Sequence, residues 1–486
     1  MARGPDSVRI GNGAGFWGDN LDAPARLAEA GALDFLTLEY LAELTLSMLA
    51  HQRRRDPEAG YVPDFPETLK RLVPSLKAQP ALKVVTNAGG LNPEACARAA
   101  ARHLAEAGMG DTRIAWVLGD DVSPRLPELK SAGERFAHFD APDREPPSGF
   151  VSANAYLGAR SIREALDGGA RIVITGRVAD ASLTVGPAMH VFGWGWEEWD
   201  KLAAASLAGH LIECGAQVTG GLRTRWSDVP GYARIGYPIA VLSRSGDCVI
   251  TKPEGSGGVV DRETVTEQLL YEIGDPSAYL TPDVTLDLSE VEVEDLGADR
   301  VRVKGAKGLP PPSTLKLSCA YANGFAAKGD LVVCGADAVE KARACGDIIL
   351  ERVRLGGYAL ARTEIELLGT GAALPGGFSP DGPFAAFAAT AQATGPSRED
   401  MDRKAPREVV LRVSAWDPRK EAIERFCREF SPIITSGPPG VTGYAGSRPK
   451  PRPVLSYWPS TVARTRVPAR VVARAASELA AKQEAA

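Results

Sequence analysis

Long apolar runs are missing from this sequence. No stretch approaches the roughly 18 uncharged apolar residues that a membrane-spanning helix needs. The first seven residues carry charge and proline with no apolar segment after them, unlike a signal peptide. We therefore expect a cytoplasmic protein with no membrane partner.

Paired cysteines and a strong net charge are missing too. The seven cysteines form no CxxC pair in a chain long enough to bury a large core, so we expect reduced thiols and no structural zinc. Lys and Arg number 56 against 61 Asp and Glu, and this balance offers no electrostatic footprint for nucleic acid. Arginine-rich segments occur only locally, at residues 52–55 and 448–452.

What the N-terminal half does contain is an alternation of short β-branched runs with amphipathic helical stretches. This pattern predicts an α/β fold with a doubly wound, mostly parallel sheet. We expect strands at residues 7–10, 35–38, 82–86, 113–118 and 171–175. We expect helices at residues 23–29, 41–53, 66–77, 93–106, 161–166, 182–190 and 197–214.

A chain of 486 residues exceeds one ordinary core, so we expect three parts. Residues 1–230 form the α/β domain, and residues 231–375 form an α+β domain that begins with a hairpin. Residues 376–486 form a C-terminal segment with a small α+β unit and a solvated helical tail. The Gly-, Ala- and Pro-rich stretch 370–396 is expected to be an irregular connection or an interface.

Small polar clusters follow the predicted strands. Ligands of open α/β sheets bind outside the carboxyl ends of the strands, so these clusters are expected to line one crevice. Glycine amides and an arginine or lysine there suit a carboxylate or phosphate. The candidate anion-binding residues are Asn12, Gly13, Gly15, Asp19, Thr86, Asn87, Gly89, Gly90, Arg177 and Lys252.

Acid–base candidates lie near residue 210. His210 and Glu213 share one face of the predicted helix, and together they supply a general acid and base near neutral pH. Asp180, at the start of another helix, is a third candidate. The alternatives are a satisfied core pair for His210 and Glu213, and a helix cap paired with Arg177 for Asp180.

Two cofactor hypotheses stay open beside a reaction that needs none. The glycines of residues 13–18, with Glu39 after the next strand, suit NAD(P) or flavin, although Phe16 and Trp17 are bulky there. Strand-end carboxylates suit Mg²⁺, although acidic loops are usually only solvated. These carboxylates are Asp19, Glu39, Asp120, Asp121 and Asp180.

Several strings of this sequence occur together in one known family. They are IGNGAGFWGD (10–19), EYLAE (39–43), TNAGG (86–90), TGRVADAS (175–182), GHLIECGAQ (209–217), TKPEG (251–255), YLTPD (279–283) and PPGVTG (438–443). Jointly they resemble the acyclic terpene utilisation (AtuA-like) family over nearly the whole chain. The namesake of that family is encoded with enzymes that degrade citronellol and geraniol through acyl-CoA intermediates.

The resemblance implies a role in the catabolism of terpenoid or branched acyl-CoA compounds. Combined with the candidate residues, it favours an acid–base enzyme of the hydratase or lyase type that acts on a carboxylate or acyl-CoA. An NAD(P)- or flavin-dependent oxidoreductase and a non-catalytic subunit of an acyl-CoA-processing complex are the alternatives. We expect a homo-oligomer, and some relatives work with a small separate subunit.

The site assignment makes a direct prediction. His210→Ala or Arg177→Ala is expected to abolish turnover while the protein stays folded, because each removes a charge-bearing group from the proposed crevice. Steady-state assays together with circular dichroism measure this. Full activity in both variants would remove the assignment.

Overall fold

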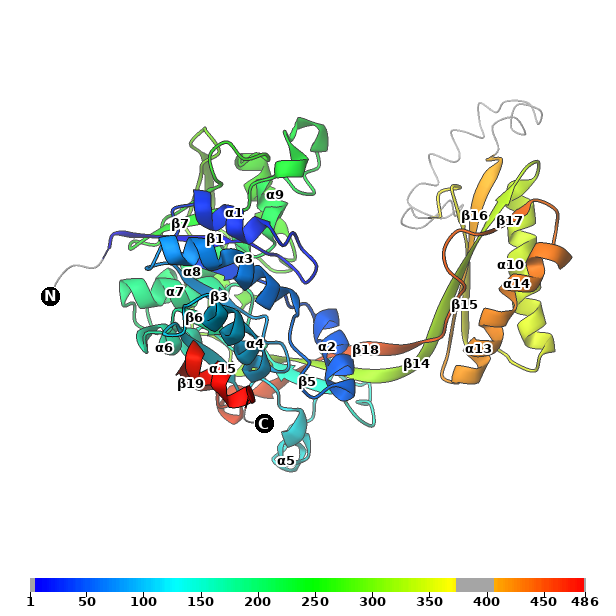
Figure 1. Ribbon diagram of the computed structural model, residues 1–486, viewed down its shortest axis with the longest axis horizontal. Coiled ribbons are helices and arrows are strands. Elements are labelled where there is room, and N and C mark those ends of the chain that lie inside the picture. The colour runs from blue at the N-terminus through cyan, green and yellow to red at the C-terminus, as the bar shows by residue number, and fades with distance from the viewer. Residues whose placement is uncertain (1–4, 373–405, 485–486) are drawn as a thin grey trace. The chain divides into compact units, whose positions relative to one another are not determined.

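The computed structural model describes residues 5–372 and 406–484, which divide into two units (Figure 1). Unit 1 comprises residues 1–321 and 457–486, and unit 2 comprises residues 322–456. The stretch expected to be an irregular connection, residues 370–396, lies outside the described residues from position 373 onward.

A ten-stranded sheet runs through unit 1 and confirms the α/β class. Its centre is a set of five parallel strands in the order β1-β2-β3-β6-β4. Antiparallel strands continue the sheet beyond β1 and beyond β4. The parallel strands are β1 (Ser7–Asn12), β2 (Phe35–Leu38), β3 (Lys83–Thr86), β6 (Ile172–Ile174) and β4 (Arg113–Leu118); the antiparallel strands are β7 (Ile239–Ser243), β8 (Cys248–Thr251), β12 (Val301–Lys304), β11 (Glu292–Asp295) and β19 (Arg470–Ala475).

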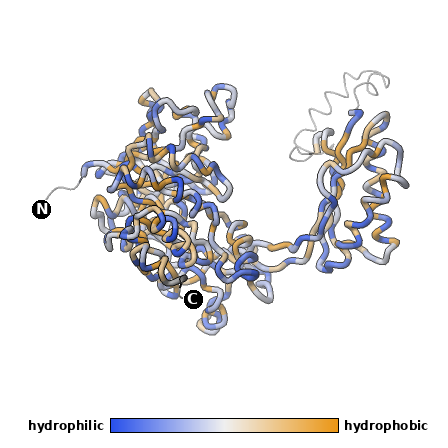
Figure 2. The backbone as a smooth tube through the Cα atoms, viewed as in Figure 1, coloured by the Kyte–Doolittle hydropathy of each residue, from blue (hydrophilic) through white to orange (hydrophobic). Residues whose placement is uncertain are grey.

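Alternate residues of the central strands enter two hydrophobic cores, one on each face of the sheet. In β3, Val84 packs into one core and Val85 into the other. The first core includes residues of α1 (Ala23–Ala30), α3 (Asp64–Ala78), α4 (Pro93–Glu106) and α15 (Ala476–Glu484). The second includes residues of α6 (Arg160–Asp167), α7 (Ser182–Phe192) and α8 (Trp199–Ile212). Helices thus cover both faces, and Figure 2 shows hydrophobic stretches along the strands between them.

The remaining elements of unit 1 surround this frame. Strands β13 (Lys307–Leu309), β10 (Thr285–Asp287) and β9 (Tyr279–Leu280) form a separate three-stranded sheet. The other elements are α2 (Glu43–Arg55), α5 (Leu126–Ser131), β5 (Ser152–Ala155), α9 (Arg262–Leu270), and the 3-10 helices η1 (Ser123–Arg125), η2 (Gly215–Thr219), η3 (Trp226–Asp228), η4 (Tyr232–Arg234) and η5 (Arg464–Arg466).

Unit 2 is a sheet covered by helices on one face. The strand order is β15 (Arg362–Leu368), β16 (Glu408–Asp417), β14 (Thr314–Cys334) and β17 (Val441–Tyr444). Helices α10 (Ala338–Leu355), α13 (Lys420–Arg428) and α14 (Phe430–Ser436) bury their apolar sides against alternate strand residues such as Leu331, Val333 and Leu411. The intervening strand residues face away from these helices.

These units do not follow the boundaries expected at residues 230 and 375. The hairpin β7–β8 pairs onto β1, so the first sheet continues past residue 230. Strand β14 belongs to both units, since it pairs with β5 in unit 1 and with β16 in unit 2. The chain returns to unit 1 within β18 (Arg452–Ala463), and β19 then joins the first sheet.

The C-terminal helix is packed, although the sequence suggested a solvated tail. Ala476 and Leu479 of α15 are buried against the core that contains α4. Because α15 follows β19 directly, its packing also holds that strand against β4.

Leu479→Ala is therefore expected to lower the free energy of unfolding by about 2–4 kcal/mol, since it leaves a cavity in a packed core. Glu478→Ala is the matched control, because the neighbouring Glu478 side chain is 61% exposed; its effect is expected to stay within about 0.5 kcal/mol. Urea unfolding followed by circular dichroism measures both. Equal stability of Leu479→Ala and the parent protein would contradict the packing of α15.

Candidate active site

The polar ends of several elements meet at one place in unit 1. Asn12 and Thr37 come from β1 and β2, Glu39 follows β2, Asp180 precedes α7, and Glu213 follows α8. The space they enclose has no room for a water-sized sphere. The expected convergence of strand ends agrees with this arrangement, but the result is a packed cluster.

Asn12 joins the end of β1 to the end of α8. Its Nδ2 donates to three backbone carbonyls, those of Ala14 (3.0 Å), Ile212 (2.8 Å) and Glu213 (2.9 Å). Its Oδ1 accepts a hydrogen bond from Thr37 Oγ1 at 3.1 Å. The Asn12 amide is fully used within the protein, so it positions the α8 end and leaves no group for a substrate anion.

The glycines at 13, 15 and 18 are also engaged. Their N–H groups donate to the Thr37 carbonyl (Gly13, 2.9 Å), the Asp19 carboxylate (Gly15, 2.9 Å) and the Asp64 carboxylate (Gly18, 3.2 Å). A Cβ on Gly15 would lie 2.6 Å from the carbonyl carbon of Cys214, so glycine is required for this loop to pack on the α8 end. The N–H groups of Gly13, Gly15 and Gly18 are therefore not available to the phosphates of a dinucleotide.

His210 and Glu213 form a buried pair at the end of α8. His210 Nε2 lies 3.0 Å from the Gln268 carbonyl, which can only accept, so Nε2 carries a proton. His210 Nδ1 faces Glu213 Oε1 at 3.3 Å. Burial alone would lower the His210 pKa, but the hydrogen bond and charge of Glu213 outweigh it and raise that pKa. Burial raises the Glu213 pKa to about 7, so the pair exchanges a proton near neutral pH.

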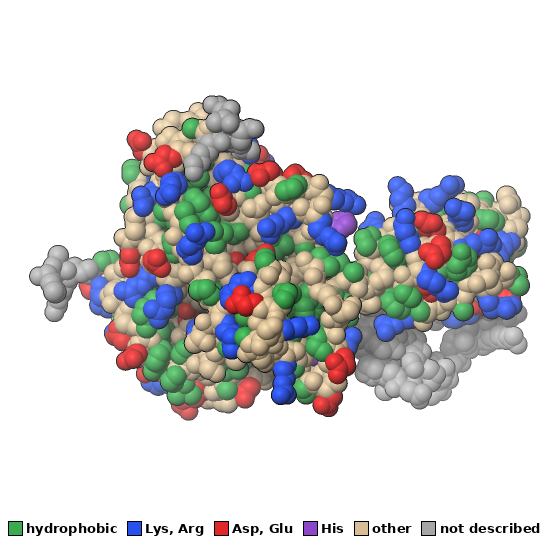
Figure 3. All heavy atoms as spheres, turned by 90° about the horizontal axis from the view of Figure 1, so that it is seen from below, with side chains coloured by type: hydrophobic (Ala, Val, Ile, Leu, Met, Phe, Trp, Pro, Cys, Tyr) green, Lys and Arg blue, Asp and Glu red, His purple; other side chains and the backbone are tan. Residues whose placement is uncertain are grey.

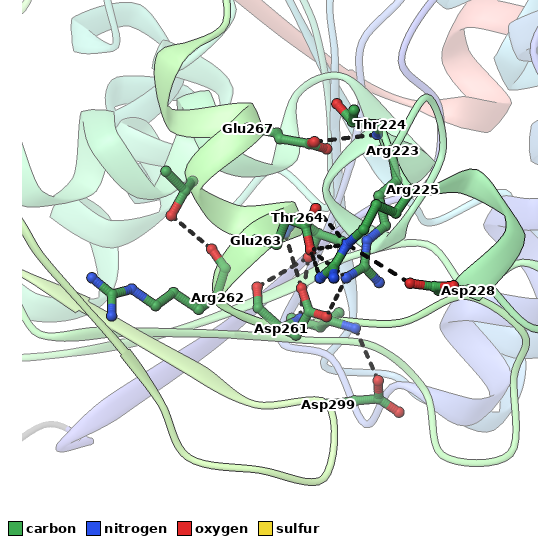
Figure 4. Close-up of polar contacts among 12 residues, drawn as sticks. Arg223, Thr224, Arg225, Asp228, Asp261, Arg262, Glu263, Thr264, Glu267 and Asp299 are labelled. Carbon is green, nitrogen blue, oxygen red and sulfur yellow. Dashed lines mark hydrogen bonds and ion pairs between the residues drawn. The ribbon is translucent and has the colours of Figure 1, made fainter.

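Helix α9 contacts the His210–Glu213 pair through Gln268. Gln268 of α9 also donates through Nε2 to the His210 carbonyl at 3.1 Å. The start of α9 is anchored by Arg223, whose guanidinium lies 2.9 Å from Asp261 and 2.6 Å from Glu263 (Figure 4). Arg223 is nearly buried, and Arg225 joins the same ion-pair cluster. These charges hold the helix that contacts His210.

Glu39 is a buried carboxyl group with one unpaired oxygen. Its Oε1 accepts hydrogen bonds from the Leu41 N–H (2.9 Å) and from Asn87 Nδ2, whereas Oε2 has no partner among the described residues. Burial, and next the charge of Asp180, raise the Glu39 pKa well above its usual value. A protonated Glu39 satisfies the geometry better than an ionised one.

Arg177 is the positive charge of the cluster. It is only 1% exposed, its Nη1 donates to the Leu41 carbonyl, and its Nη2 pairs with Asp180 Oδ1. Its guanidinium carbon lies 4.1 Å from the centre of the Tyr156 ring. Arg177 therefore holds Asp180 and does not reach an open crevice as an anion ligand. Its removal would leave buried carboxylates unpaired, at a typical cost of about 3–5 kcal/mol, so Arg177→Ala would not leave stability unchanged.

Asp180 is the member of the cluster that reaches the surface. Its side chain keeps 35% of its area exposed, against 11% for Glu213. Burial and the charge of Glu43 raise the Asp180 pKa, whereas Arg177 lowers it. Like charges close together in a poorly solvated place cannot all ionise at low cost. Burial raises the pKa of all three carboxyl groups, Glu39, Asp180 and Glu213, and the charge of Asp180 raises it further at Glu39 and Glu213.

A second group of side chains lies beside Asp180 and was not found from the sequence. Tyr156 Oη donates to Glu43 Oε1 at 2.7 Å, and Lys316 Nζ donates to the same oxygen at 2.9 Å. Burial would raise the Glu43 pKa, but Lys316 and Tyr156 lower it to about 2. Lys316 is 40% exposed. No local motif marks Lys316 or Tyr156, since the pairing of β14 with β5 brings them together.

Asp120 locks the loop that carries Arg177. Its carboxylate accepts hydrogen bonds from the Arg177 N–H (2.8 Å) and from Asn154 Nδ2 (2.9 Å). Burial raises the Asp120 pKa to about 6. A Cβ on Gly176 would lie 2.5 Å from both oxygens of this carboxylate, so glycine is required there.

Comparison with known proteins identifies the family. A family model described as acyclic terpene utilisation family protein AtuA matches residues 8–473. The chain belongs to this family. Membership supports a role in acyclic terpene utilisation. No curated protein and no solved structure gives a significant match.

The other AtuA-family motifs lie around the cluster as supports. Thr86 Oγ1 donates to the Leu38 carbonyl at 2.9 Å. A Cβ on Gly89 would lie 2.5 Å from the Thr175 carbonyl oxygen, and Gly90 has a positive φ of 52°. Gly89 and Gly90 allow the strand ends to pack closely together, and the Asn92 side chain caps α4.

Two predicted anion-binding residues bind other groups of the protein. Lys252 Nζ lies 2.9 Å from Asp299 and 3.0 Å from the Ser256 carbonyl. Asp19 bonds the Gly15 N–H and the Tyr237 hydroxyl. Neither lines the cluster of Glu39, Asp180 and Glu213.

Metal and thiol chemistry find little support in the described parts of this AtuA-family chain. No three His, Cys, Asp or Glu side chains of residues 5–372 and 406–484 are grouped to hold a metal ion. Burial raises the pKa of Cys214 to about 12, which disfavours a thiolate nucleophile. Of the helices the structure describes, none combines the length and hydropathy that a membrane crossing requires.

The Glu213 carboxyl predicts a pH-dependent stability. Its folded pKa of about 7 exceeds the value of 4.5 for an unperturbed carboxyl, so its contribution is complete below pH ~4.5 and is lost as pH rises through ~7. The raised His210 pKa acts in the same direction. Relative to the parent, Glu213→Gln is therefore expected to gain stability between pH 5 and 8, by at most about 3 kcal/mol.

Denaturant unfolding at a series of pH values measures this difference. Glu197→Gln is the control, because Glu197 is exposed. A stability difference between Glu213→Gln and the parent that stays constant from pH 5 to 8 would show that Glu213 is not a buried, proton-holding group.

Proposed function

We propose that this AtuA-family protein is an acid–base enzyme of the hydratase or lyase type, acting on a carboxylate or acyl-CoA of terpenoid or branched origin. The observation that carries the proposal is the cluster of three carboxyl groups, Glu39, Asp180 and Glu213, in which Arg177 is paired with Asp180 and His210 with Glu213. A structural ion pair needs one carboxylate for one arginine. Additional carboxyl groups with raised pKa values are typical of sites that move protons.

The groups differ in the way that acid–base chemistry requires. Burial raises the Glu39 pKa well above its usual value, and it raises the Glu213 pKa to about 7. Asp180 is the exposed member of the cluster, so it would contact the substrate. Glu39 and Glu213 would exchange protons with Asp180 from the buried side. The side-chain roles proposed from sequence for His210, Glu213 and Asp180 are kept in this scheme.

Hydration of an alkene conjugated to a carbonyl needs both protonation states at once. Water loses a proton to an ionised carboxylate as its oxygen bonds to the β-carbon, and a protonated group delivers a proton to the α-carbon. The reverse reaction eliminates water. No electron acceptor is consumed in either direction, so the scheme requires no redox cofactor.

Lys316 is the proposed contact for the anionic part of the substrate. Lys316 is 40% exposed, and it binds the same Glu43 oxygen as Tyr156 does. Arg177 is 1% exposed and binds the Leu41 carbonyl and Asp180, and its Nε has no partner among the described residues. A carboxylate or carbonyl near Lys316 would lie beside Asp180, because the charge of Lys316 is felt by the Asp180 carboxyl. This assignment moves the anion-binding role from Arg177 to Lys316.

The test measures turnover of α,β-unsaturated branched acyl-CoA thioesters and their free acids. Asp180→Asn and Glu213→Gln are each expected to lower kcat by about 10²–10⁴, the usual contribution of a positioned acid or base. The acid limb of the kcat/KM profile is expected near pH 7, since Glu213 must ionise before it can take up the proton that Asp180 receives. Lys316→Met is expected to raise KM more than it lowers kcat.

Glu197→Gln serves as the control and is expected to keep parental kinetics. Parental rates in both Asp180→Asn and Glu213→Gln would overturn the mechanism. Turnover that requires added NAD(P) or flavin would instead support the oxidoreductase alternative.

A further inference from the structure

Unit 2 contains a hollow of about 680 Å³ that has no part in the scheme above. Its floor is the sheet face opposite the three helices, with residues of β14, β15 and β16, and residues 446–452 form a wall. This volume is within the range of about 300–1,000 Å³ that small-molecule sites occupy.

Positive charge dominates the lining. Five cationic side chains reach the hollow: Lys328, Arg362, Arg448, Lys450 and Arg452. The acidic lining residues are Asp330 and Glu364, and Asp330 is already bound by Arg412 at 2.9 Å. In the described part of the chain, no carboxylate forms an ion pair with Lys328, Arg448, Lys450 or Arg452. Lys and Arg side chains are prominent over unit 2 in Figure 3.

The wall is stiff. Pro449 and Pro451 alternate with Arg448, Lys450 and Arg452, and each proline restricts its own φ and keeps the preceding residue extended. Pro449 is buried, whereas all three cations are exposed. The three charges are therefore presented without the entropy cost of ordering a flexible loop.

A flat aromatic surface lies in the same hollow. Trp416 is half-buried, and its Nε1 donates to the Asn323 carbonyl at 2.6 Å, which fixes the plane of the indole ring. The Arg362 guanidinium carbon lies 5.3 Å from the centre of a Trp416 ring. The guanidinium lies over the indole, and a heteroaromatic base can stack on either of these flat groups.

From these observations we infer that the unit 2 hollow binds a phosphorylated small molecule of the nucleotide class. The phosphates contact the cations of the wall and Lys328, and the base stacks on Trp416. An adenosine diphosphate group occurs both in free adenine nucleotides such as ADP and in coenzyme A. The inference does not depend on the proposed function, because it rests on residues of unit 2 alone.

The experiment is isothermal titration of the full-length protein with ADP, coenzyme A, pyrophosphate, adenosine and a single-stranded RNA. Saturable binding of ADP or coenzyme A is expected, with pyrophosphate weaker by tenfold or more. Arg448→Ala/Lys450→Ala is expected to weaken binding of every phosphate compound at least tenfold. Trp416→Leu is expected to bring ADP down to the affinity of pyrophosphate and to leave pyrophosphate unchanged.

The matched control is Arg343→Ala/Arg428→Ala, which removes two exposed cations from α10 and α13 of the same unit. It is expected to bind as the parent does.

Equal loss in both double variants, no heat with any compound, or tighter binding of a single-stranded RNA than of ADP would each overturn the inference. Stronger binding of coenzyme A than of ADP would identify the acyl carrier as the source, and the reverse would identify a free nucleotide. The titrations do not measure turnover, so their outcome does not depend on whether the acid–base mechanism is correct.

Discussion

One buried charge organises the candidate active site. The Arg177 side chain is almost fully buried, so the positive charge of its guanidinium must be balanced by neighbouring groups. Asp180, the Leu41 carbonyl and the face of Tyr156 provide that balance. Burial, and after it the charge of Asp180, leave Glu39 and Glu213 with raised pKa values. The proton-holding property of the cluster follows from the burial of these two carboxyl groups beside Asp180.

The geometry of the cluster depends on close backbone packing. The loop after β1 touches the end of α8 at Gly15, and the loop after β6 touches the Asp120 carboxylate at Gly176. Asn12 completes the connection with three hydrogen bonds to backbone carbonyls. Glycines that suggested a phosphate-binding loop in the sequence are thus explained by contacts within the protein. A glycine required by a turn and a glycine required for ligand binding cannot be told apart in a sequence, because both roles depend only on the absence of a Cβ atom.

Much of the fold could be predicted from the sequence. The five central strands and the helices between them have strong local periodicity, and the structure contains each of them close to the expected position. The convergence of strand ends near His210 also followed from a general property of open α/β sheets. The route of the C-terminal chain could not be predicted. Strand β19 joins the edge of the first sheet through pairing with β4, and pairing between distant segments leaves no mark in local periodicity.

The sequence by itself determined the family, the α/β class and the acidic and basic residues from which a site could be built, since these depend on residue types and short-range patterns. Only the tertiary structure decided which of those residues are accessible. It buried Arg177, left Asp180 partly exposed, and placed Lys316 beside Glu43, 273 residues away in the chain. The pKa of a carboxyl group depends on its burial and on its charged neighbours, and both are properties of the packed chain.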